Sequence, residues 1–197
     1  MARNITSYTI ASGKYLELKE LEFINDDGKI LKWEAAQRRG NKQAVSVITI
    51  KAPTTDSGWS IVLVRQFRPP TGKYCIENPA GIIEEGETIE QAALRELKEE
   101  TGYTGRIVFT GYPTESSAGM TGELVTPVVA VVDDTEENRH PIQHLDNAEC
   151  IKIIELPANN LEEQLKKMHD AGDCISGRLV NMLIGLKLSG IISKWSY

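Results

Sequence analysis

The sequence predicts a layered α+β fold, or a related α/β fold, with a small antiparallel β unit at its N-terminal end. Short runs rich in β-branched residues alternate along the chain with segments whose apolar residues recur at helical spacing. A chain of 197 residues, of which 41% are hydrophobic, is also long enough to bury a sizeable core in one domain with a small appendage.

An antiparallel hairpin is expected within residues 16–33. Leu16/Leu18 and Leu21/Phe23 show the period-two spacing typical of a strand with one covered face, and Asp26-Asp27-Gly28 supplies the turn that follows. A polar stretch then ends the unit. We therefore expect two parts, an N-terminal β unit at residues 1–42 and the main domain at residues 43–197.

The main domain is expected to begin with a pair of strands. The runs VSVITI (residues 45–50) and IVLVRQF (residues 61–67) are dominated by β-branched and aromatic residues, and the polar loop between them allows the chain to reverse. Two further strands are predicted at residues 123–132 and 150–156. These apolar runs are too short to span a bilayer, so we expect no membrane association.

Three helices are expected, and the first is the best defined. Thr88 is a favourable N-cap with Gln91 three residues later, apolar residues recur at helical spacing up to Leu97, and Gly102 can end the helix. Amphipathic patterns predict the other two helices at residues 160–169 and 177–188.

Composition narrows the possible partners and the compartment. A net charge of -6, without a cluster of basic residues interleaved with aromatics, argues against a nucleic-acid partner. The three cysteines are Cys75, Cys150 and Cys174, which are too widely spaced to suggest a disulfide framework or a zinc site. The start MARNITSY lacks an apolar leader. A reducing, cytoplasmic setting is therefore the default, and nothing argues against a nuclear pool as well.

Three glutamates on the first helix form a candidate functional cluster. Glu96, Glu99 and Glu100 are spaced i, i+3 and i+4, which places their carboxylates on one face, where each close pair costs about 0.2–0.5 kcal/mol. Such a face is usually only solvated, with neighbouring basic residues relieving the repulsion. A bound divalent cation would instead turn the repulsion into attraction.

The spacing around these glutamates favours the second interpretation. Gly81 is followed after five residues by Glu87, and after seven more by Arg95-Glu96-Leu97, Lys98, Glu99-Glu100, Thr101, Gly102 and Tyr103. This frame resembles the Nudix box, GX5EX7REUXEEXGU with U an apolar residue, at every fixed position. Seven strict matches by chance have a probability on the order of 10⁻⁸. The resemblance implies the Nudix fold, an α/β/α sandwich with a mixed sheet, and hydrolysis of a nucleoside diphosphate linked to a second group.

The resemblance also implies a metal site. Oxygen ligands suit a hard cation, so Mg²⁺ is expected and Mn²⁺ is a plausible substitute. Glu99 is a ligand or a catalytic support, and Arg95 braces the carboxylates from behind. The metal-binding positions implied by the resemblance are Glu96, Glu100, Glu77 and the carbonyl of Ala80.

Segments before the box indicate a branch of the family. VRQFRPP (residues 64–70) and YCIENPAG (residues 74–81) resemble the ADP-sugar and ADP-ribose pyrophosphatases, and the similarity extends from about residue 15 to the C-terminal helix. Within it Arg68 matches a contact to the pyrophosphate, which a guanidinium can bridge. Aromatic rings could stack on the adenine. The further substrate contacts that the resemblance implies are Trp33, Arg38, Tyr15 and Ile82.

A loop after the box and an acid before the last strand complete the candidates. Glu149, in the segment DNAEC, matches the position that acts as catalytic base, although the residue alone would suggest a solvated loop acid. The branch often has a Ser-Pro-Gly loop, but residues 116–120 are SSAGM and lack the proline. Ser117 and Met120 remain candidate ligand contacts, while the preference among sugars stays open.

Three functions are compatible with these residues. The first is hydrolysis of ADP-ribose or another ADP-sugar to AMP and a sugar phosphate. The second uses the same machinery on another nucleotide, such as an oxidised nucleoside diphosphate, NADH or a GDP-sugar. The third is a module that binds ADP-ribose without cleaving it, which the intact glutamate set argues against. By resemblance, the N-terminal unit pairs with a second subunit in a homodimer.

Overall fold

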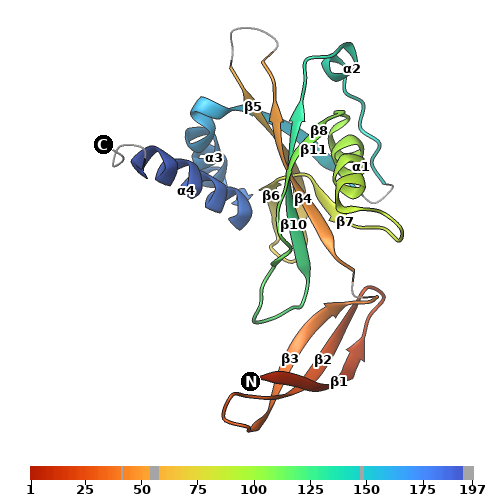
Figure 1. Cartoon of the computed structure of the whole chain (residues 1–197). Helices are drawn as coiled ribbons and strands as arrows, with labels where there is room; N and C mark the ends of the chain where they lie inside the picture. The colour runs from red at the N-terminus through yellow and green to blue at the C-terminus, as the bar shows by residue number, and fades with distance from the viewer. Residues whose placement is uncertain (41, 54–57, 147–148, 193–197) are drawn as a thin grey trace.

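The protein consists of a three-stranded sheet and a nine-stranded sheet flanked by helices. The structure, a computed structural model, describes residues 1–40, 42–53, 58–146 and 149–192, so that residues 54–57 of the predicted loop PTTDSG lie outside the described residues. The three-stranded sheet lies at one end of the main body in Figure 1, and Ala36 of its third strand contacts Met120 and Thr121 of the main body. None of the helices described here is long and apolar enough to cross a membrane.

The N-terminal sheet is an antiparallel meander of β1 (Arg3–Ser12), β2 (Leu16–Ile24) and β3 (Ile30–Arg38). Strands β2 and β3 are the hairpin that the sequence predicts. Strand β1 is an addition to that hairpin, and nearly all of its residues are exposed, so no apolar alternation marks it in the sequence. Several large apolar side chains stay exposed on this sheet, among them Ile5, Tyr8, Ile10 and Trp33.

The main sheet is mixed, as predicted. Its central path runs in the order β12 (Cys174–Ile175), β6 (Lys73–Glu77), β5 (Ser60–Arg68), β4 (Ala44–Lys51), β10 (Leu124–Val132) and β8 (Arg106–Thr110). Beside this path β7 (Ala80–Ile82) pairs with β4, β9 (Thr114–Glu115) with β10, and β11 (Ile151–Pro157) with β5. Strand β10 is parallel to β4 and β12 is parallel to β6, while the other pairs are antiparallel. The predicted β4–β5 pairing is confirmed.

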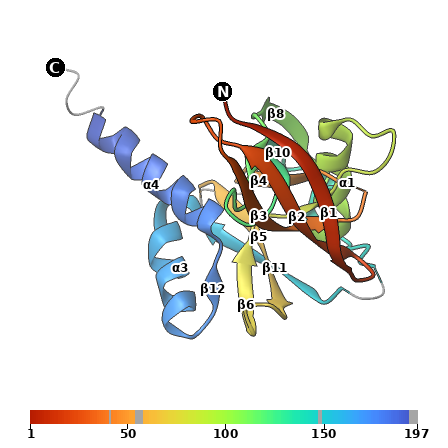
Figure 2. The same cartoon turned by 90° about the horizontal axis from the view of Figure 1, so that it is seen from below.

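Helices cover both faces of the main sheet. They are α1 (Ile89–Thr101), α2 (Glu136–Arg139), α3 (Leu161–Asp170) and α4 (Gly177–Ile192). Val62 of β5 packs in the core under α1, whereas its neighbours Ile61 and Leu63 pack in the core with α3 and α4, because successive strand residues point to opposite faces. Figure 2 shows α1 on one side of the sheet and α3 with α4 on the other. The predicted sandwich is therefore confirmed.

Helix α1 begins and ends where the sequence predicts. The Thr88 hydroxyl accepts a hydrogen bond from the Gln91 backbone N–H at 3.2 Å, and the Gln91 side chain accepts one from the Thr88 N–H at 2.8 Å. Gly102 adopts the left-handed conformation, with φ of 73°, and its N–H donates to the Lys98 carbonyl. These caps fix the phase of the helix, and hence the direction in which its glutamates point.

Candidate active site

The candidate site forms where β7 meets α1. Gly81 lies in β7 and is paired with Val45 of β4. A Cβ atom added to Gly81 would overlap the carboxylate of Glu96 on α1. Glycine at this position therefore allows the helix to bring Glu96 against the backbone of β7, which gives a physical reason for the first residue of the motif.

Arg95 ties the glutamates of the motif together. Its Nε and Nη2 donate to the two carboxylate oxygens of Glu87 at 2.7 and 2.9 Å, and its Nη1 donates to Glu96 at 2.8 Å and to Glu99 at 3.0 Å. Nη2 also donates to the Ile82 carbonyl at 2.9 Å. The hydrogen bonds from Arg95 lower the pKa of Glu87 to about 2. The guanidinium thus contacts three glutamates of the motif, Glu87, Glu96 and Glu99.

Glu100 is buried, with 3% of its surface exposed, and its Oε2 accepts a hydrogen bond from the Ala80 backbone N–H at 3.0 Å. Burial raises the pKa of Glu100 to about 8, and the charges of Glu96 and Glu149 raise it as well. Burial also raises the pKa of Glu96. A cation bound beside such carboxylates would stabilise their charged form.

The donor set fits a hard divalent cation, because every group it offers is an oxygen. Arg95 engages one oxygen each of Glu96 and Glu99, and Ala80 engages one of Glu100, so the second oxygen of each is without a hydrogen-bond donor among the described residues. In that same part of the chain, no three acidic, histidine or cysteine side chains already lie close enough to form a complete metal cage. A divalent cation bound here would offset the repulsion among these carboxylates.

A cavity of about 500 Å³ opens beside this cluster. Two predicted residues lie behind its lining: Glu77 accepts a hydrogen bond from Arg68 Nε at 2.7 Å, and Glu100 is held by Ala80. The cavity brings together most of the residues singled out from the sequence, namely Arg38, Arg68, Ala80, Ile82, Arg95, Glu96, Glu99 and Glu149.

The remaining predicted substrate contacts lie on the N-terminal sheet and on the loop at residues 116–120, outside the lining of this cavity. Trp33 is about half exposed, and its Nε1 donates to the Gly119 carbonyl at 3.0 Å. The Ala36 N–H donates to the Met120 carbonyl at 2.9 Å. These bonds hold β3 against the loop that carries Ser117 and Met120. Tyr15 lies in the turn between β1 and β2, and it is exposed.

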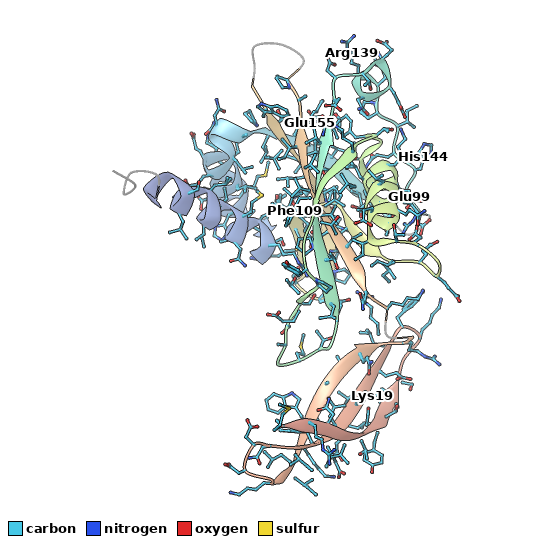
Figure 3. The ribbon with its side chains drawn as sticks, viewed as in Figure 1. Lys19, Glu99, Phe109, Arg139, His144 and Glu155 are labelled. Carbon is cyan, nitrogen blue, oxygen red and sulfur yellow. The ribbon has the colours of Figure 1, made fainter. Side chains whose placement is uncertain are left out.

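The cavity also includes residues that the sequence analysis does not single out. His144 is one example, and Figure 3 shows it beside Glu99, whose carbonyl accepts a hydrogen bond from the His144 N–H at 2.9 Å. Except for Glu84, which occupies a variable position of the box, these residues come from loops and element ends outside it, so motif spacing cannot find them. The others include Lys42, Glu84, Ser116, Glu123, Asp146 and Arg178.

Comparison with known proteins agrees with this geometry. Residues 40–172 match the model of the NUDIX domain. The ADP-sugar pyrophosphatase of Mus musculus is 38% identical over 162 residues, which cover 79% of this chain and 73% of that protein. The ADP-ribose pyrophosphatase of Saccharomyces cerevisiae is 32% identical over 181 residues, which cover 89% of this chain and 78% of that protein.

A solved structure shares the fold. The crystal structure of an ADP compounds hydrolase matches this chain with a TM-score of 0.62 at 19% sequence identity, over 84% of this chain and 83% of that one.

Proposed function

The chain belongs to the Nudix family of hydrolases, and we propose that it hydrolyses the pyrophosphate bond of ADP-ribose or related ADP-sugars to AMP and a sugar phosphate. The observation that carries the proposal is the glutamate cluster braced by Arg95 on the wall of a polar cavity that Arg38 and Arg68 also line. The printed names of the mouse and yeast relatives indicate the same substrate class.

Nudix hydrolases work with divalent metals, and Mg²⁺ is the ion we propose here, with Mn²⁺ as a substitute. Glu96, Glu100 and the Ala80 carbonyl would hold it, and Glu77 would add a nearby negative charge. When bound, such an ion supplies charge stabilisation to a phosphoryl oxygen and lowers the pKa of water.

The remaining chemistry falls to side chains of this chain. Arg68 lines the cavity, and its planar fork suits the oxygens of a diphosphate. Arg95 keeps Glu96 and Glu99 oriented. Glu149 would take the proton of the attacking water: its Oε2 accepts from the Asp146 N–H at 3.1 Å, which leaves Oε1 for a second partner.

We assign recognition of the nucleotide base to the N-terminal part of the chain. Trp33 and Tyr15 present exposed rings that can stack on adenine, and Arg38 lies at the cavity. Ile82, Ser117 and Met120 are the further proposed contacts. The exposed apolar residues of the N-terminal sheet support a homodimer, because a sheet normally buries at least one face, and a second copy would cover it. We expect this enzyme to work in the cytoplasm.

Phosphate-31 NMR of the purified full chain with ADP-ribose and Mg²⁺ tests the proposed reaction. AMP and ribose 5-phosphate should appear, and neither should form with EDTA or with the Glu100→Gln variant. Cleavage of NADH, a GDP-sugar or an oxidised nucleoside diphosphate in place of ADP-ribose would retain the chemistry and replace the substrate. Binding of ADP-ribose without turnover would replace the enzyme with a binding module.

Light scattering during size-exclusion chromatography tests the proposed dimer. A mass of about twice the 21.8 kDa of the chain is expected, and a monomer mass would overturn the assignment.

A further inference from the structure

Arg178, in the first turn of α4, lines the same cavity as Arg38, Arg68 and Arg95. In the sequence, Arg178 lies far from the N-terminal sheet. Its helix, α4, packs on the face of the main sheet opposite to the face that α1 covers. Figure 2 shows that α4 reaches the sheet with its first turns and then extends away from it. Among the described residues of α4, only Arg178, in the first turn, lines this cavity.

Arg178 forms no salt bridge with a carboxylate among the described residues, although its charge contributes to lowering the pKa of Glu123, which is itself paired with Arg38. Arg68 is paired with Glu77. The guanidinium of Arg178 instead donates from Nη2 to the Ser116 hydroxyl at 3.0 Å. A neutral partner leaves the positive charge, and most of the five N–H donors, available to an anionic ligand.

Ser116 holds this guanidinium in a fixed direction. Its hydroxyl donates to Glu123 Oε2 at 3.0 Å, so its lone pairs are left to accept from Arg178. Glu123 in turn accepts from Arg38 Nε at 2.5 Å. This hydrogen-bonded string crosses the cavity wall from β3 to α4. Lys42, another cation in the lining, has no such orienting bond among the described residues.

We propose that Arg178 is a substrate-binding residue that donates hydrogen bonds to the diphosphate oxygens. The assignment rests on the proposed function and adds a diphosphate contact supplied by the C-terminal helix. An acid-rich cavity needs positive charge that is not already paired if it is to hold a dianion, and Arg178 supplies an oriented guanidinium of that kind. A sugar hydroxyl would use the hydrogen bonds of Arg178 but would leave the charge without a counterpart.

Steady-state kinetics with ADP-ribose test the contact in Arg178→Gln, Arg178→Lys and a control, Lys187→Gln. Arg178 is exposed, so its substitutions should leave the fold intact. Lys187 is on the same helix but pairs with Glu162, and neither residue lines the cavity. Arg178→Gln should reduce kcat/KM about 10- to 100-fold. The kcat/KM of Arg178→Lys should lie between those of Arg178→Gln and the wild type, because lysine keeps the charge but lacks the planar guanidinium.

Calorimetric titration with inorganic pyrophosphate and Mg²⁺ gives a second readout that does not require turnover. Affinity should fall about ten-fold or more in Arg178→Gln and remain unchanged in Lys187→Gln. Equal affinities in Arg178→Gln and the wild type, or equal losses in both variants, would overturn the assignment. If the proposed function were wrong, the wild type would bind pyrophosphate but leave ADP-ribose intact. This outcome is distinct from the outcomes that overturn the role of Arg178.

Discussion

Gly81 and Glu96 are in direct contact, so that the backbone of β7 and a carboxylate of α1 fill a space that no side chain at residue 81 could share. The contact joins the strand that offers the Ala80 carbonyl to the helix that offers the glutamates. Because residue 81 has no Cβ, the Glu96 carboxylate can lie against the strand that carries Ala80, which we propose as a metal ligand.

Replacing Gly81 with alanine should therefore displace Glu96. We expect kcat/KM for ADP-ribose to fall at least about 100-fold, since small misplacements of catalytic groups are that costly. We expect the free energy of unfolding, measured in urea, to fall by about 1–3 kcal/mol. Gly185→Ala, at an open position of α4, is the control and should retain activity and gain roughly 0.5–1 kcal/mol. Normal activity in Gly81→Ala would contradict the role of the contact.

Replacing Arg95 with lysine tests the brace. Lysine keeps the charge but cannot bridge both oxygens of Glu87 while contacting Glu96 and Glu99. The Mg²⁺ concentration for half-maximal activity should rise about 10- to 100-fold, because supporting residues of metal ligands have effects of that size. Arg106→Lys, in an exposed pair with Asp133, should leave it unchanged. A lower rate at an unaltered Mg²⁺ requirement would instead place Arg95 in direct contact with substrate.

Glu149→Gln separates proton transfer from binding. The amide has nearly the same shape but cannot take a proton, so kcat should fall about 10²- to 10⁴-fold while KM changes little. Glu163→Gln, an exposed substitution on α3, serves as the control. If kcat stays at the wild-type value, another group removes the proton from water.

Stability should depend on pH through Arg65 and Asp173. Arg65 donates to the two Asp173 oxygens at 2.8 and 2.7 Å, and these bonds hold the pKa of that carboxyl below its usual value. Such a carboxyl adds stability above its unfolded pKa and loses that contribution as the pH falls through its folded pKa. Asp173→Asn should therefore cost about 1–3 kcal/mol at neutral pH, and less as the pH falls below about 4. Urea unfolding of both proteins across this range measures the difference, and a cost independent of pH would argue against the ion pair.

Sequence predicts the parts of this fold that local interactions determine. The caps of α1 involve Thr88, Gln91 and Gly102, each within a few residues of its partner, and the structure places all of them as expected. Strand β1 could not be predicted in the same way, because its exposed residues follow no apolar pattern and its pairing with β2 determines its conformation.

The same distinction applies to the candidate site. The spacing from Gly81 to Gly102 is enough to predict the glutamate cluster and its brace. Glu123, Ser116 and Arg178 reach the cavity only through tertiary packing, and as isolated residues they resemble ordinary polar surface residues. A motif predicts chemistry that lies on one helix and its loop. Cavity walls assembled from distant segments can be identified only from a three-dimensional structure.

The strand registers also have a consequence for the order in which the chain folds. The pairings among β1, β2 and β3 lie within residues 3–38, so these strands are made before those of the main sheet, although Ala36 also contacts Met120 and Thr121. The pairing of β4 with β10, in which Ala44 faces Val125, and the pairing of β5 with β11 form only after residues 124–132 and 151–157 have been made. Contacts that close short loops form faster than those that close long ones. We therefore expect the meander to form on the ribosome first, and the cavity, whose wall includes Arg178, to be completed among the last features of the fold.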